Sequence, residues 1–146
     1  MTSKLHILAR AVIVSSGHVL VAKAKGSPNT FLPGGHVELG ESLEATLTRE
    51  LAEEIGVVAY VGRYLGAIEH SWEKAGVKNY EINHCFLLRS DELRPDEPVI
   101  SRESHLEFHW LKFVELAANN LQPFPLQKLL LNLESDIPTA WWASTL

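Results

Sequence analysis

The chain has 146 residues, a length typical of one domain that buries most of its apolar surface without disulfides. Its composition, 46% hydrophobic and 21% charged, excludes collagen-like, low-complexity and disordered proteins. The formal net charge of −5 provides no basic surface for duplex nucleic acid, which we do not expect as a partner. We therefore expect a single domain over residues 1–146.

The N-terminal segment and the cysteine content indicate a location. His6 and Arg10 interrupt the first apolar stretch, so it has no signal-peptide core. No apolar run reaches the roughly 18 residues that cross a bilayer. Cys85 has no second cysteine for a disulfide, which favours a reducing compartment. These features predict a cytoplasmic protein that does not bind membranes.

The first half of the chain predicts a hairpin, two loops and a helix. Leu5–Val14 and His18–Lys25 have the composition of strands around the turn sequence SSGH. GSPNT predicts a loop, FLP a short extended piece, and GGHVELGE a second loop. The helix is predicted over Leu43–Ile55, because Ser42 is a good N-cap, leucines recur at every fourth residue and Gly56 is a good stop.

The second half predicts three strands and two short helices. Two long β segments, Val57–Ser71 and Asn79–Arg89, flank the polar loop EKAGVK. After the charged loop SDELRPDEPVISRES, a strand is predicted at Leu106–Phe113 and helices at Val114–Asn119 and Pro125–Leu133. The tail IPTAWWASTL is apolar without a clear period. This order of elements predicts an α/β fold, in which helices cover a mixed sheet.

The predicted helix carries an acidic cluster in the segment RELAEE. At about 100° per residue, Glu50, Glu53 and Glu54 fall on one face of the helix. Such runs are usually solvated surface, but Glu54 falls at the edge of the apolar stripe, with Glu50 beside it. Half-buried like charges cost free energy unless a cation lies among them. Since Arg49 is one cation against three acids, a divalent metal is the expected partner.

Magnesium suits such a site, with Mn²⁺ as a substitute. Mg²⁺ is held by few carboxylates and fills its other positions with water and substrate phosphates. Sites of this kind hydrolyse phosphoanhydrides, since the metal lowers the pKa of a water and a carboxylate can remove its proton. The glycines of GGH, just before the helix, let the backbone approach the metal or phosphate closely.

The stretch from Gly35 to Val57 resembles the signature of the Nudix hydrolase family at every fixed position. That signature reads G, five residues, E, seven residues, REU, one residue, EE, one residue, GU, with U aliphatic. A chance match is on the order of one in ten million for a chain of this length. The resemblance implies hydrolysis of a nucleoside diphosphate linked to another moiety. It also implies a Nudix-type α/β/α sandwich with a mixed sheet and a catalytic loop-helix-loop.

The resemblance also implies roles for individual residues. The metal ligands, bound directly or through water, would be Glu50, Glu53, Glu54 and the backbone carbonyl of Gly34. Arg49 and Glu41 would orient the catalytic groups, paired with each other. Family members often recruit a further acid from a loop near the last strand, as ligand or base. Glu103 is the first candidate for that acid and Glu107 the second, and each could instead be a surface acid.

Other side chains have two interpretations each. Lys23 could contact a substrate phosphate or be a solvated lysine. Phe31 and Leu32 could wall a base or ribose pocket or pack in the core. The i, i+4 pair of His105 and His109 lies on a predicted strand without a nearby cysteine, which argues against zinc.

The substrate within the family remains open at this level. Some ADP-ribose-directed relatives carry a proline after the signature, and some dinucleoside-polyphosphate relatives a tyrosine. Here the region reads EHSWEK, with neither marker. A nucleoside triphosphate, oxidised forms included, is the first candidate for this small-molecule partner, ahead of an NDP-sugar or ADP-ribose. The non-enzymatic alternative is a nucleotide-sensing module that has lost turnover.

Adjacent Trp141 and Trp142 could cover the core or form a dimer contact, so both monomer and homodimer are open.

Overall fold

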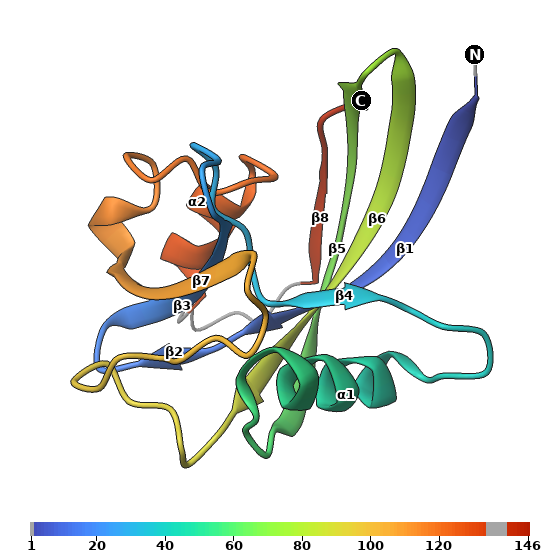
Figure 1. The fold of residues 1–146 in the computed structure, drawn as a ribbon. Helices are drawn as coiled ribbons and strands as arrows, with labels where there is room; N and C mark the ends of the chain where they lie inside the picture. The colour runs from blue at the N-terminus through green and yellow to red at the C-terminus, as the bar shows by residue number, and fades with distance from the viewer. Residues whose placement is uncertain (1, 134–139) are drawn as a thin grey trace.

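The strands of residues 2–133 and 140–146, the part of the chain that the computed structural model describes, form two sheets (Figure 1). The larger sheet has the order β4-β1-β6-β5-β8 and the smaller β2-β3-β7. The elements are β1 Ser3–Val12, β2 Val14–Ser15, β3 His18–Ala24, β4 Gly34–His36, α1 Leu43–Ile55, β5 Tyr60–Lys74, β6 Val77–Arg89, β7 Leu106–Lys112, the 3-10 turn η1 Phe113–Glu115, α2 Leu126–Leu129, the 3-10 turn η2 Leu130–Asn132 and β8 Trp141–Ser144.

The first predicted strand is divided between the two sheets. β1 ends at Val12 and β2 starts at Val14, so the chain passes from the larger sheet into the smaller one. In the larger sheet β1 pairs in parallel with β6 and antiparallel with β4, while β5 pairs antiparallel with β6 and in parallel with β8. The predicted α/β class with a mixed sheet is confirmed.

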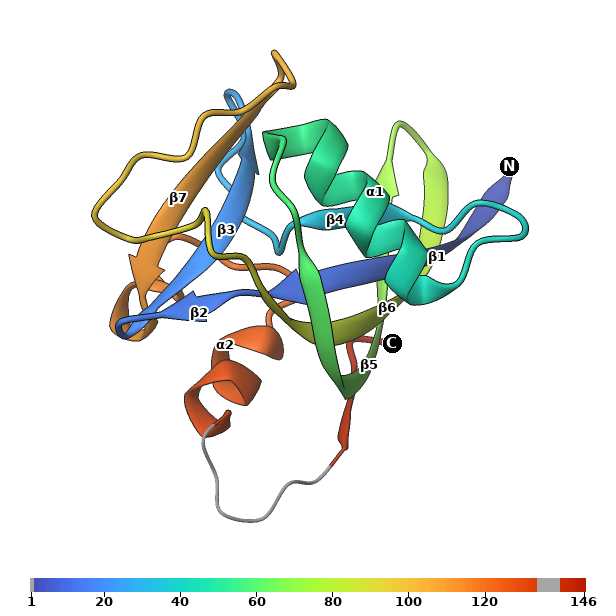
Figure 2. The same ribbon diagram turned by 90° about the horizontal axis from the view of Figure 1, so that it is seen from below.

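Helix α1 has the predicted bounds. The Ser42 side chain accepts a hydrogen bond from the Ala45 amide at 3.0 Å, and Gly56 ends the helix with a φ of 68°. Leu47 and Leu51 have no exposed surface and pack in a core with side chains of both sheets. The helix therefore lies against β4 and β1, as Figure 2 shows from below.

A second core lies on the other side of the smaller sheet. Val19 and Val21 of β3 pack there against Leu116, Leu126 and Leu130 from the C-terminal turns and helix. The two cores place α1 and the C-terminal segment on opposite sides of β3 and β7 (Figure 1). The larger sheet diverges from the smaller one, and the end of it that carries both termini projects away from α2 (Figure 1).

The prediction of a loop over the whole of EKAGVK is wrong. β5 runs on to Lys74 and pairs with Val77, leaving only Ala75 and Gly76 in the turn. Both turn residues have positive φ, 51° and 76°, as a two-residue hairpin turn of type I′ requires. The end of the hairpin is exposed on both faces, so its strands need no apolar alternation and look like a loop in sequence.

The C-terminal elements also differ from the prediction. The helix expected at Val114–Asn119 is limited to the turn η1, and Asn120 follows with a φ of 49°, which a helix does not tolerate. The helix expected at Pro125–Leu133 is divided into α2 and η2. Leu116 of the first segment and Leu126 and Leu130 of the second pack in the second core, while Val114 and Leu131 are exposed, so the main apolar contacts form without a regular helix.

The tail contains a strand that the sequence did not predict. β8 joins the larger sheet beside β5, and Trp141 is buried in the second core while Trp142 is exposed. Four residues are too few to show a period. The first tail residues, 137–139, lie outside the described part of the chain. Among the helices that the structure describes, none has the length and apolar content to cross a membrane.

Candidate active site

Helix α1 approaches the backbone of β4 most closely at Gly35. The register of β4 on β1 pairs Gly35 with Ala9, which packs in the α1 core. A Cβ at Gly35 would lie 2.5 Å from Oε1 of Glu50, closer than real Cβ contacts. Glycine at this position therefore allows the Glu50 carboxylate to lie directly on the strand backbone.

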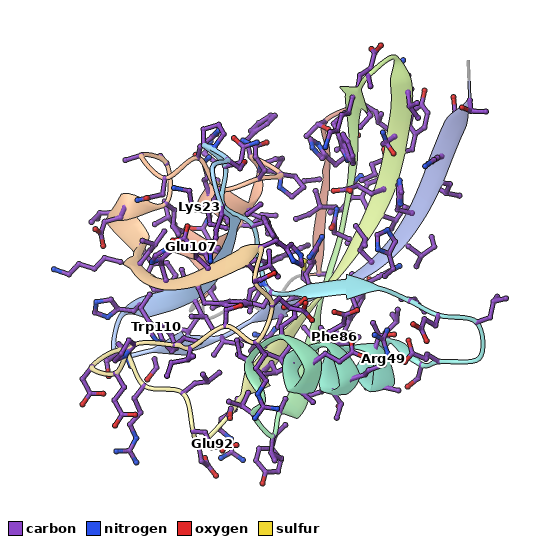
Figure 3. All side chains as sticks on the ribbon, viewed as in Figure 1. Lys23, Arg49, Phe86, Glu92, Glu107 and Trp110 are labelled. Atoms are coloured by element: carbon purple, nitrogen blue, oxygen red, sulfur yellow. The ribbon has the colours of Figure 1, made fainter. Side chains whose placement is uncertain are left out.

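Arg49 joins the loop after β4 to the helix (Figure 3). Its Nε and Nη2 donate to the two oxygens of Glu41 at 2.7 and 2.9 Å. Nη2 also donates to the carbonyl of His36 at 3.1 Å, and Nη1 donates to Glu50 at 3.0 Å. The hydrogen bonds from Arg49 lower the pKa of Glu41 to about 2. The expected pairing of Arg49 with Glu41 is present, and it fixes the loop on α1.

Glu50 and Glu54 lie together where α1 packs against the sheet strands β4 and β1. We call these two residues the acid pair. Glu54 is 8% exposed, and the side chain of Glu50 is 15% exposed. Burial, together with the neighbouring Glu50 carboxylate, raises the pKa of Glu54 to about 8. Oε2 of Glu54 is buried and has no hydrogen-bond partner among the described residues. This arrangement requires a proton or a cation at the acid pair.

Glu53 lies apart from the acid pair. Its side chain is 54% exposed, and Oε2 lies 3.4 Å from Nη1 of Arg49. The helix face therefore divides into a buried pair and one acid at its solvent edge. Within residues 2–133 and 140–146, no three His, Cys, Asp or Glu side chains converge as a preformed metal cluster.

The acid pair fits a hard divalent cation. A buried carboxylate oxygen without a donor is an unsatisfied oxygen ligand. Mg²⁺ is held by one or two carboxylates and takes its remaining ligands from water and phosphate. Glu50 and Glu54 would hold the ion, with Glu53 and the carbonyl of Gly34 as the other expected oxygen donors.

The two acids considered outside the helix occupy different places. The amide of Arg102 donates to the carbonyl of Glu54 at 2.7 Å, which anchors the loop before β7 on the end of α1. Glu103 follows in this loop, close enough for its charge to raise the pKa of Glu54. In β7, Leu106 and Phe108 face the α1 core, so Glu107 between them lies on the opposite face.

Lys23 lies on the same face as Glu107. The two residues are paired in the register of β3 and β7, and Figure 3 shows them together on the smaller sheet.

Phe31 and Leu32 line a cleft of about 570 Å³ between the larger sheet and the segment from Gln122 to Leu126, called here the cleft. Leu32 is 1% exposed and belongs to the second core, so its core interpretation is confirmed, while its role in a base or ribose pocket stays a prediction.

Sequence reasoning did not find the polar wall of the cleft. Arg10, Trp72, Glu81 and Asn83 line it from three neighbouring strands of the larger sheet. The ring Nε1 of Trp72 donates to Glu81 at 3.1 Å, and Nδ2 of Asn83 donates to the other oxygen of Glu81 at 3.2 Å. One signal was present, since Arg10 falls between Leu8 and Val12 on a face of β1 that is otherwise apolar at these positions.

A profile described as the NUDIX domain matches residues 5–132 of the chain. The chain belongs to the Nudix family. This Nudix protein is 31% identical over 130 residues to the oxidized purine nucleoside triphosphate hydrolase of Danio rerio, covering 86% of the chain and 80% of that protein. It resembles the solution structure of the E. coli ORF135 protein with a TM-score of 0.68 and 25% identity, covering 94% and 96% of the two chains.

A second relative is longer than this chain. Isopentenyl-diphosphate Delta-isomerase 2 of Photorhabdus laumondii is 29% identical over 108 residues, which cover 74% of the chain. The match spans 52% of the isomerase, about half of its length. The predicted family is thus confirmed, while the names of its members describe more than one reaction.

The contribution of Glu54 to the free energy of unfolding of the metal-free protein should fall as pH rises from about 4.5 to about 8. Over this range Glu54 keeps its proton in the folded protein and loses it in the unfolded chain, so the folded state binds more protons. Glu54→Gln should remove this part of the slope, and Glu53→Gln, at an exposed acid, should not. Urea unfolding in EDTA at several pH values measures it. Equal slopes in wild type and Glu54→Gln would contradict the prediction.

Magnesium should stabilise the folded protein, because the acid pair is assembled only in the native state. At a hundred-fold excess over Kd the gain is about 2.7 kcal/mol. Thermal melts with Mg²⁺ and with EDTA measure the difference, and Glu54→Gln should lose most of it. A wild-type Tm that does not change at saturating metal would count against a site at the acid pair.

Proposed function

We propose that this protein is a Mg²⁺-dependent pyrophosphohydrolase that cleaves the phosphoanhydride bond of a nucleoside diphosphate derivative. The observation that carries the proposal is the acid pair, in which the buried Glu54 has an oxygen without a hydrogen-bond partner among the described residues and Glu50 lies against the backbone at Gly35. A divalent ion bound there would neutralise phosphate oxygens and lower the pKa of an attacking water. Membership of the Nudix family supports a hydrolase that acts on pyrophosphate bonds.

The residues around the acid pair have separate tasks in this proposal. Arg49 positions Glu50 and holds the loop through Glu41. Glu53, at the solvent edge of the helix, is a group that can accept a proton from water. Glu103, on the loop anchored at the end of α1, is the other candidate for that base or for a further metal ligand.

A nucleoside triphosphate, oxidised forms included, is the substrate that we favour. The name of the Danio rerio relative supports a purine triphosphate. The cleft has the size of a small-ligand site and combines the aromatic rings of Phe31 and Trp72 with the polar groups of Glu81 and Asn83. A nucleoside can use both kinds of group, whereas the hydrocarbon chain of isopentenyl diphosphate cannot use the polar ones. Lys23 shares the β3 face of Val19 and Val21, on the side of the second core, but it is not among the residues that line the cleft, so it has no place in this proposal.

The deciding experiment is a panel of substrates with Mg²⁺. The phosphorylated products of ordinary and 8-oxo nucleoside triphosphates, UDP-glucose, ADP-ribose and isopentenyl diphosphate are separated by anion-exchange chromatography. The triphosphates would release pyrophosphate or phosphate, whereas UDP-glucose and ADP-ribose would each release a nucleoside monophosphate and a sugar phosphate. Cleavage of the triphosphates supports the proposal. Preferred cleavage of UDP-glucose or ADP-ribose would move the assignment to the alternative, an NDP-sugar or ADP-ribose pyrophosphatase. Nucleotide binding without cleavage of any compound would indicate a sensing module.

Glu54→Gln should lower kcat by about a hundred-fold or more, because the substitution removes a charged ligand from the acid pair. The matched control is Glu44→Gln, an exposed acid in the first turn of the same helix, which should keep wild-type turnover. Steady-state kinetics with Mg²⁺ measures both. A Glu54→Gln protein with wild-type kcat would exclude α1 as the metal platform.

Glu103→Gln should lower kcat at least about ten-fold with little change in Tm, whereas Glu107→Gln should have a smaller effect on turnover. The reason is position, since Glu103 lies near Glu54 and Glu107 lies on the face of β7 away from α1. The same kinetic assay ranks the two variants. The reverse ranking would assign the role to Glu107, and normal turnover in the double variant would leave catalysis to the helix acids.

A further inference from the structure

Arg10 is a half-buried cation in the wall of the cleft. Its neighbours on the same face of β1, Leu8 and Val12, are 2% and 0% exposed. None of the ion pairs found in residues 2–133 and 140–146 includes Arg10. A charge removed from water in this way usually has an opposite charge in contact with it. The carboxylates of Glu81, Glu54 and Glu50 act on Arg10 electrostatically, but none of them forms an ion pair with it in the described residues.

Neutral groups hold the guanidinium in place. Nε donates to Oδ1 of Asn83 at 3.3 Å, and Nη1 donates to the carbonyl of Leu32 at 3.2 Å. The guanidinium carbon lies 5.5 Å from the centroid of the Phe31 ring. The nearest acid of the wall, Glu81, accepts its hydrogen bonds from Trp72 and Asn83. Arg10 is therefore oriented by neutral contacts, and the acids that act on its charge leave the guanidinium without a carboxylate in direct contact among the described residues.

One nitrogen of Arg10 remains available. In the described part of the chain Nη2 makes no hydrogen bond, and it is not among the atoms that are buried without a partner. This nitrogen therefore keeps access to solvent in the cleft. An oriented guanidinium with free N–H donors is well suited to bind a phosphoryl oxygen.

Arg10 lines the cleft and is also within electrostatic reach of the acid pair, beside the edge strand β4. In the register of β1 and β4 it is opposite Gly34, next to the glycine that contacts Glu50. Its charge lowers the pKa of Glu54, so it is within electrostatic reach of the acid pair. A nucleoside in the cleft whose phosphates extend to the acid pair would pass this point with its first phosphoryl group.

We propose that Arg10 binds the phosphoryl group attached to the nucleoside, and that it thereby selects 5′-phosphorylated ligands for the cleft. The inference rests on the proposed function in one respect, namely that the cleft holds the nucleoside of the substrate. It adds a selectivity that the acid pair does not supply, because Arg10 acts on the phosphate that remains with the nucleoside.

The test compares nucleoside 5′-monophosphates with nucleosides in EDTA, where metal makes no contribution. Calorimetry gives Kd for GMP and guanosine, and for AMP and adenosine. Wild type should bind the monophosphate about ten-fold to a hundred-fold more tightly than the nucleoside, as a charge-assisted contact provides. Arg10→Met should remove this preference and keep the Kd of the nucleoside. Arg63→Met, at an exposed arginine of β5, should keep the wild-type preference.

A second variant covers the case in which Arg10→Met does not fold. Arg10→Lys keeps the charge but loses the planar fork, and it should reduce the preference without abolishing it. An unchanged preference in the folded variants overturns the inference, as does a wild-type protein that binds monophosphate no more tightly than nucleoside. Failure of the proposed function is a separate result, since it is the absence of phosphoanhydride cleavage by wild type.

Discussion

Two carboxylates buried side by side, Glu50 and Glu54, are the constraint on which the surrounding structure depends. Like charges removed from water destabilise a fold unless a proton or a cation joins them. Arg49 binds one oxygen of Glu50, and Oε2 of Glu54 has no partner in the described residues. The helix is held instead by its leucine stripe, with Leu47 fully buried. The acid pair is thus arranged for a ligand, and the packing of the adjoining leucine stripe holds the helix in place.

Strand β1 supplies both sides of the candidate site. Ala9 and Ala11 face α1, and their small side chains allow the helix to approach the sheet. Arg10 and Val12 point to the opposite face, toward the cleft and the second core. Because side chains alternate along a strand, neighbouring residues serve the acid pair on one face and the cleft on the other. A shift of one residue in the register of β1 would exchange these faces.

The parts of the fold that follow from local signals could be predicted from sequence. Helix α1 has its predicted bounds because its cap, its period and its stop lie within the segment itself. The polar wall of the cleft depends on pairing between distant strands, since Arg10 and Asn83 are 73 residues apart in sequence. β8 depends in the same way on pairing with β5. Neither the register nor a strand of four residues leaves a periodic signal in one sequence.

This division between local and distant residues bears on specificity. The acid pair and its supports come from one continuous stretch between Gly34 and Gly56, whereas the cleft is assembled from separate strands. Substitutions in the cleft can therefore change the bound group while the chemistry at the acid pair stays the same. Two relatives of this chain carry the names of a purine nucleoside triphosphate hydrolase and an isopentenyl-diphosphate isomerase, so the names among its relatives cover different bound groups and more than one reaction. Arg10 lies where the two parts meet, and a phosphoryl contact there is compatible with many different groups in the rest of the cleft.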